Sequence, residues 1–229
     1  MTKIDFKKQM KDLYSPPRGR FSIVEVPRMN YIMIDGRGDP NTAPAYQQAV
    51  EALYATAYKL KFTSKKELAK DYVVPPLEGL WGSEGMQAKL AAAQNAADWQ
   101  AIFAVSDRHE WRWTMMIMQP AWITAEMVTR IREQVGKAKD LPALEKLRFD
   151  SLDEGLSVQV LHVGPYADEG PVLAEMHLDF IPNNGYVEGG KHHEIYLSDP
   201  RKTAPEKLKT VLRQPVKENK CVDESFARF

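Results

Sequence analysis

The strongest constraint on the fold of this 229-residue chain is an order of short segments that occurs twice. Each half has an apolar extended segment ending in glycine, then a helix-forming segment, then two more extended segments, the last ending in Gln-Pro. The first half has YIMIDG at 31–36, LEGLW at 77–81 and MIMQP at 116–120; the second has QVLHVG at 159–164, HEIYL at 193–197 and VLRQP at 211–215. Two strand–helix–strand–strand modules can bury their helices on one side and join their sheets into a concave surface. The sequence therefore predicts an α+β fold with a ligand site where the halves meet.

The loops differ in length between the two copies, which indicates an old duplication. The stretch from Gly36 to Glu78 is longer than the stretch from Gly164 to Glu194. We expect an N-terminal segment at 1–20 that leads into a single domain at 21–216. Its first half spans about 21–122 and its second about 145–216, and a charged tail follows at 217–229.

Composition excludes several classes of partner. Lys and Arg total 31 and so do Asp and Glu, so the net charge is zero. The chain therefore lacks the basic excess that gives non-specific affinity for nucleic acid, and we expect no direct nucleic-acid contact.

Cys221 is the single cysteine, so no internal disulfide forms. Because the first residues lack the apolar core of a signal peptide and no apolar run reaches membrane-spanning length, we expect a cytoplasmic protein with no membrane contact. The oligomeric state stays open.

The strand HHEIY carries the most suggestive polar pattern. His192, Glu194 and Tyr196 share one face, while His193, Ile195 and Leu197 point the other way. The second set is mainly apolar, so we expect it to face the helices and Glu194 to lie on the open face. Glu194 on an exposed face would only pair with a nearby cation. Among aromatic side chains it would be desolvated, with a raised pKa, and could bind a cationic ligand or act as a general base towards water.

Glu78 occupies the matching place in LEGLW, so we expect two carboxylates to approach one cleft. Trp81 would face away from Glu78 in a regular strand, unless a bulge at Gly79 turned it inwards. Trp111 and Trp113 share a face and are either core residues or a flat slot for a polycyclic or cationic guest. Tyr166 is either a surface-turn residue or a further aromatic wall.

The spacing of residues does not predict a metal site or a cofactor site. The histidines show no recognised ligand interval, and GRGDP lacks the third glycine of a dinucleotide-binding fingerprint. We expect neither a metal nor a cofactor. The expected partner is a small apolar, aromatic or cationic molecule.

Several motifs resemble a known family across about residues 5–216. They are KDLYSPPRGRFSIVEVPRMNYIMIDGRGDPN, PPLEGLWG, EWRWTMMIMQP, VGPYADEGPV and GGKHHEIYLSDPRKTAPEKLKTVLRQP. Together they resemble the GyrI-like small-molecule-binding proteins, in the stand-alone branch without a DNA-binding domain. The resemblance implies duplicated modules of the SHS2 type with a pocket between the halves. It also implies that Glu194 sits at the pocket floor and meets cationic or electrophilic ligands.

Some stand-alone members of that family are cyclopropanoid cyclopropyl hydrolases, which add water to the strained ring of DNA-alkylating natural products. If that activity carries over, the resemblance implies a water-activating role for Glu194 or Glu78. The flat substrate would be held by Trp81, Trp111, Trp113 and Tyr196, and the dienone oxygen would accept from His192 or Tyr166. Two other functions stay open: sequestration or sensing of hydrophobic cations without turnover, and docking of a protein partner.

Overall fold

The computed structural model describes residues 2–82, 95, 97, 98 and 108–219. The helices are α1 (Phe6–Gln9), α2 (Lys11–Tyr14), α3 (Pro44–Glu67), α6 (Ala125–Ala138), α7 (Gly170–Ala174) and α8 (Ile181–Asn183), with a π-helical turn at Glu175–Phe180 between the last two. The strands are β1 (Ser22–Val26), β2 (Met29–Arg37), β3 (Leu77–Gly82), β4 (Arg112–Gln119), β5 (Arg148–Leu152), β6 (Gly155–Val163), β7 (Tyr186–Glu188), β8 (His192–Tyr196) and β9 (Lys209–Glu218). Short 3-10 turns lie at Arg108–Glu110, Leu144–Lys146, Tyr166–Asp168 and Pro205–Lys207.

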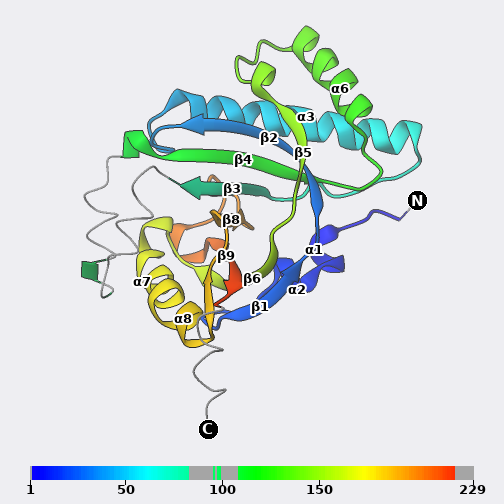
Figure 1. Ribbon diagram of the computed structural model, residues 1–229. Helices are drawn as coiled ribbons and strands as arrows, with labels where there is room; N and C mark the ends of the chain where they lie inside the picture. Colours follow the sequence, from blue (N-terminus) through cyan, green and yellow to red (C-terminus); the bar gives the residue numbers. More distant parts are fainter. Residues whose placement is uncertain (1, 83–94, 96, 99–107, 220–229) are drawn as a thin grey trace.

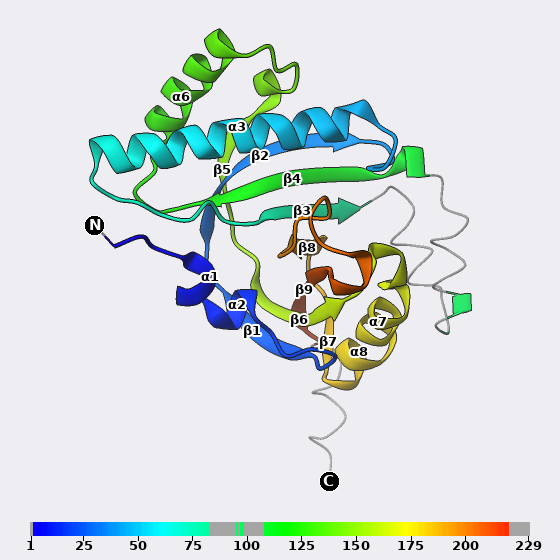
Figure 2. The same cartoon turned by 180° about the vertical axis from the view of Figure 1, so that it is seen from behind.

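The strands form one antiparallel sheet whose order confirms the duplicated modules. The order is β1-β6-β9-β8-β3-β4-β2-β5, and β7 adds to β9. Read outwards from the central β3–β8 pair, β3, β4 and β2 of the first half mirror β8, β9 and β6 of the second. Figures 1 and 2 show the two halves facing each other across a strongly curved sheet.

The strand that leads into each half pairs with the other half. β1 precedes β2 but pairs with β6, and β5 precedes β6 but pairs with β2. Pro27 lies between β1 and β2, outside both ladders, where a missing backbone N–H costs no sheet hydrogen bond. Separation of the halves would therefore break these two strand pairs as well as the central β3–β8 pair.

The helices of both halves cover the same face of the sheet. Ala49, Leu53, Ala57 and Leu60 recur at helical spacing and seat α3 on β2 and β4, while α6 packs against α3. In the second half, the α7–α8 segment packs on the same face of β6 and β9 through a cluster that includes Val160 and Leu212. The central strands β3 and β8 lie between these two helical layers (Figure 1).

Glu78 and Glu194 lie on opposite faces of the sheet, so the expected pair of carboxylates in one cleft is wrong. In the β3–β8 ladder Glu194 is opposite Gly79, and Glu78 is opposite Ile195. Opposed residues in an antiparallel ladder share a face, and successive residues alternate between faces. Glu194 therefore points to the helical layer, and Glu78 points away from it. The expectation that His193 and Ile195 would face these helices is also wrong, because Ile195 packs with Leu13 and Tyr14 of α2 on the other face.

The prediction for Glu78 failed because the short strands of the two halves were aligned one residue out of register. If the Gln-Pro segments are aligned, Met116 of β4 corresponds to Val211 of β9. The β3–β4 ladder places Glu78 opposite Met116. The β8–β9 ladder places Ile195 opposite Val211. Glu78 thus corresponds to Ile195, and a shift of one residue moves a side chain to the other face.

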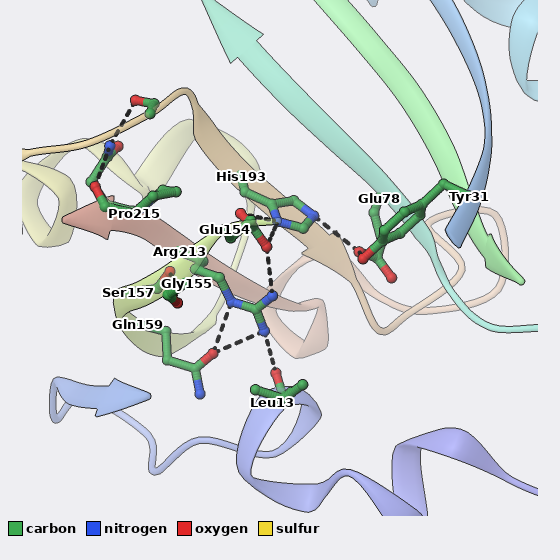
Figure 3. Close-up of polar contacts among 12 residues, drawn as sticks. Leu13, Tyr31, Glu78, Glu154, Gly155, Ser157, Gln159, His193, Arg213 and Pro215 are labelled. Atoms are coloured by element: carbon green, nitrogen blue, oxygen red, sulfur yellow. Dashed lines mark hydrogen bonds and ion pairs between the residues drawn. The ribbon is translucent and has the colours of Figure 1, made fainter. Parts of the chain in front are cut away.

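On the face away from the main helices, four buried charged side chains join the two halves (Figure 3). His193 Nδ1 donates to both oxygens of Glu154, at 2.9 and 3.0 Å. His193 Nε2 lies 3.0 Å from Glu78 Oε2, an ion-pair contact outside good hydrogen-bond alignment. Arg213 Nη1 donates to Glu154 Oε2 at 3.2 Å. The charges alternate in sign along this set, which we call the seam network.

The short N-terminal helices cover the seam network. Arg213 Nη2 donates to the carbonyl of Leu13 at 2.8 Å and to Gln159 Oε1 at 3.0 Å. Gln159 in turn donates to the carbonyl of Asp12. Segment 1–20 is therefore part of the packed structure, because carbonyls of α2 accept hydrogen bonds from buried side chains of β6 and β9.

Two tyrosines complete the surroundings of Glu78. Tyr14 of α2 donates to Glu78 Oε1 at 3.1 Å, and Tyr31 of β2 donates to Glu78 Oε2 at 3.3 Å. Burial and the charge of Glu78 raise the pKa of both phenols well above the usual range, so both remain donors. Each oxygen of Glu78 therefore accepts a hydrogen bond in the core.

The seam network is held in its charged form by its own members. Burial alone would lower the pKa of His193, but the charges and hydrogen bonds of Glu154 and Glu78 raise it to about 9. Burial raises the pKa of Glu154, and His193 with Arg213 overcomes this and lowers it to about 2. Removing one member leaves the others desolvated without compensation, which is the costly case for buried ion pairs.

Glu154→Gln should lower the free energy of unfolding by about 3 kcal/mol, because it removes the carboxylate shared by His193 and Arg213. Urea denaturation at pH 7 measures the change. Glu25→Gln on the exposed edge of β1 is the control, with a change within about 0.5 kcal/mol. Equal stability of the two variants would show that the seam network does not hold the halves together.

Stability should also depend on the protonation of His193. A folded-state pKa of about 9, above the unfolded value, adds stability that is fully present below pH ~6.5 and is lost as the pH rises through about 9. Wild type should therefore lose stability over this range more steeply than Glu154→Gln. Urea denaturation at several pH values tests this, together with NMR titration of the His193 ring. Ring titration near pH 6.5 in the wild type would contradict the prediction.

Candidate functional site

The helix-facing side of the central strands carries a cluster of aromatic and carboxyl side chains. Leu77, Gly79 and Trp81 of β3 face this side, opposite Tyr196, Glu194 and His192 of β8. The expectation that Trp81 would point away from the site without a bulge is wrong, for the same reason that Glu78 is absent from it. We call this cluster the aromatic site.

Glu194 is the carboxyl at the centre of the aromatic site. Its Oε2 accepts from Tyr196 Oη at 2.8 Å, and Tyr196 Oη accepts from Trp81 Nε1 at 3.0 Å. Burial raises the pKa of Glu194 to about 7, against the opposing effects of the Tyr196 hydrogen bond and the His193 charge. Glu194 can therefore take up and release a proton near neutral pH, as a general base must.

Three aromatic rings extend from Glu194 towards the start of α3. Tyr46 of α3 stacks on Trp81 with ring centroids 6.3 Å apart, and Trp111 meets Trp81 edge-on at 5.9 Å. Trp111 Nε1 is buried without a hydrogen-bond partner among the described residues. Rings in this arrangement present both faces and edges to a flat guest.

Trp113 is a core residue that packs against Tyr46 of the aromatic site. Its side chain is buried, its Nε1 donates to the carbonyl of Gly38 at 3.2 Å, and its ring packs edge-on against Tyr46 at 5.3 Å. The ring lies over Gly36, where an added Cβ would come within 2.0 Å of it. Of the two interpretations that the sequence left open for Trp113, the structure supports the core.

Gly79 leaves room for the polar contacts of the site. A Cβ at this position would come within 2.9 Å of Trp81 Nε1 and 3.2 Å of Tyr196 Oη. Any larger residue would displace the hydrogen bond between Trp81 and Tyr196, and with it the support of Glu194.

Tyr166 and His192 lie at the second-half side of the cluster. The Tyr166 ring meets Tyr196 edge-on at 5.7 Å, although its own side chain remains partly exposed. His192 Nε2 is 3.8 Å from Glu194 Oε1, beyond hydrogen-bond length, and both ring nitrogens are buried without a hydrogen-bond partner in the described structure. Burial lowers the pKa of His192 to about 3, so the ring is neutral and carries one N–H donor.

A second carboxyl of the aromatic site escaped the sequence analysis. Glu169 precedes α7, is 5% exposed, and has a buried Oε1 without a hydrogen-bond partner among the described residues. Burial raises its pKa to about 10, and the charge of Glu194 adds to the rise. The only signal in the sequence was an acidic residue in the turn YADEGP, which is also what an exposed loop looks like.

The aromatic site offers one carboxyl near its ionisation point, a neutral one, a neutral imidazole and several ring faces. Such groups are able to contact aromatic or cationic molecules, and a carboxylate of this kind is able to accept a proton. No group of three His, Cys, Asp or Glu side chains in the described residues is placed to hold a metal ion. A surface hollow at the end of α6, lined by Arg132, Gly136 and Leu141 among others, lies apart from this chemistry.

None of the described helices is long and apolar enough to span a membrane.

No curated protein matches the chain. Two solved structures from Listeria innocua are similar to it: an uncharacterized conserved protein with 41% identity and a TM-score of 0.81, and a hydrolase with 40% identity and a TM-score of 0.77. Each comparison covers 94% of this chain and 100% of the other.

The family model for the GyrI-like small molecule binding domain matches residues 20–217, from just before β1 to near the end of β9. This range contains both modules and every residue of the aromatic site. The chain therefore belongs to the GyrI-like small-molecule-binding family.

Proposed function

We propose that this protein hydrolyses the cyclopropane ring of flat, electrophilic, DNA-alkylating compounds, with Glu194 as the general base. The observation that carries the proposal is Glu194 itself, a desolvated carboxyl with a pKa of about 7 among aromatic rings. The similar Listeria innocua structure described as a hydrolase supports turnover in this family at 40% identity.

The chemistry needs a water, a base and an acceptor for negative charge. Glu194 takes a proton from water, whose oxygen forms a bond to a CH₂ carbon of the strained ring. The ring C–C bond to the spiro carbon breaks, and its electron pair moves into the dienone, whose oxygen becomes a phenolate. Trp81 and Trp111 hold the flat system in place, and the N–H of His192 is one candidate donor to the developing oxyanion.

Binding without turnover is the second candidate function. The same carboxylate, walled by Tyr46, Trp81 and Trp111, is suited as the counter-charge of a hydrophobic cation. In that case the protein sequesters or senses such compounds, and a cyclopropane compound would bind and be released unchanged.

Glu194→Gln should lower the rate of ring hydrolysis by about 100-fold to 10,000-fold, because the amide keeps the shape but cannot accept the proton. Mass spectrometry of the hydrated product from a spirocyclopropyl cyclohexadienone measures the rate. Glu206→Gln, in the exposed turn Pro205–Lys207, is the matched control and should match the wild type. Stoichiometric binding by the wild type without product would reject hydrolysis in favour of the second function.

Tyr196→Phe should move the acidic limb of the pH–rate profile to higher pH. The Tyr196 hydrogen bond lowers the pKa of Glu194, so its loss raises that pKa above about 7 and the base ionises later. Tyr58→Phe on the exposed side of α3 should leave the limb in place. An unchanged limb in Tyr196→Phe would argue against Glu194 as the titrating base.

A further inference from the structure

The first observation concerns a buried carboxyl oxygen that lacks a well-aligned partner. In the described residues, Glu169 Oε1 is buried without a well-aligned hydrogen-bond partner, and the buried Thr210 side chain lies close enough to Glu169 to favour its ionised form. Such atoms are rare in folded proteins, because each forfeits the hydrogen bonds it made in water. An orphaned carboxyl oxygen at 5% exposure therefore calls for a role that the fold alone does not supply.

The second observation is that these atoms belong to the aromatic site. Thr210 of β9 lies opposite Tyr196 in the β8–β9 ladder, so its side chain shares the face of Glu194. Glu169 follows the turn that brings Tyr166 against the Tyr196 ring. The ionisable groups that face it are Tyr166 from its own segment and Glu194 and Tyr196 from β8.

The third observation is that the two carboxyls differ in their surroundings. Glu194 accepts a hydrogen bond from Tyr196 and feels the positive charge of His193, and both favour its ionised form. Burial and the charge of Glu194 disfavour the ionised form of Glu169, and the nearby Thr210 side chain favours it. Unlike surroundings of this kind divide acid and base roles between two carboxyls.

We propose that Glu169 and Glu194 form a carboxyl pair that holds one proton, and that Glu169 donates this proton to a carbonyl or phenolate oxygen of the ligand. The donor role rests on the proposed hydrolysis. There, the O–H bond of Glu169 breaks as the dienone oxygen becomes a phenol, while Glu194 gains the proton of water. Each turnover leaves Glu169 ionised and Glu194 protonated, and one proton passing from Glu194 to Glu169 restores the pair.

Infrared spectroscopy of the unliganded protein tests the pair without any substrate. At pH 8 an ordinary carboxyl is ionised and Glu194 is largely so, whereas Glu169 keeps its proton. Wild type should show a protonated-carboxyl C=O band that Glu169→Gln removes. Glu175→Gln, an exposed control at the start of the π-helical turn, should retain it. In Glu194→Gln the band should persist but disappear at lower pH than in wild type, because the neighbouring charge is gone. A wild-type spectrum without the band, or a band that survives Glu169→Gln, would overturn the pair.

Turnover of a spirocyclopropyl cyclohexadienone tests the donor role. Glu169→Gln should lower kcat by about 100-fold or more, since its amide hydrogen-bonds but transfers no proton, while Glu175→Gln should match the wild type. Wild-type kcat in Glu169→Gln would overturn the donor role and leave the hydrolase proposal standing. Absence of turnover in the wild type would reject the hydrolase proposal and the donor role together, whereas the infrared result decides the carboxyl pair in either case.

Discussion

The seam network is the interaction on which the rest of the structure depends. Its four charges alternate in sign and come from β3, β8, β9 and the turn before β6, so they bind both halves of the duplication to each other. Isolated buried charges would be unstable there, but each has an opposite partner and the donors left over reach the carbonyls of α2. The network therefore fixes the orientation of β8, because His193 can reach Glu154 and Glu78 from only one face of the strand.

The aromatic site is the other consequence of that orientation. With His193 committed to one face, Glu194 must point to the other, between the helical layers of the two halves. There it lies among the rings of Tyr46, Trp81 and Tyr196; burial raises its pKa, and the hydrogen bond from Tyr196 opposes the rise. The same strand thus stabilises the fold with one residue and offers a reactive carboxyl with the next, and the charge of His193 keeps that carboxyl from becoming fully protonated at neutral pH.

The sequence was sufficient to predict the architecture, and it put Glu194 forward as the centre of the candidate site. The repeated order of segments predicted the two modules, and the alternation in HHEIY predicted which side chains share the face of Glu194. It failed on Glu78, since a short strand can be aligned one residue out of register without any loss of apparent similarity, and only the ladder reveals the slip. Glu169 was missed because its burial comes from contacts with strands that are distant in sequence, which no local pattern records.

The most direct test of this account is the position of a bound ligand. The Glu194→Gln variant, crystallised with a spirocyclopropyl cyclohexadienone, should retain the intact compound because its base is missing. We expect density against Trp81 and within hydrogen-bond reach of Gln at position 194, on the helix-facing side of β3 and β8. Density at the hollow beside α6, or on the Glu78 side of the sheet, would contradict the assignment of the site.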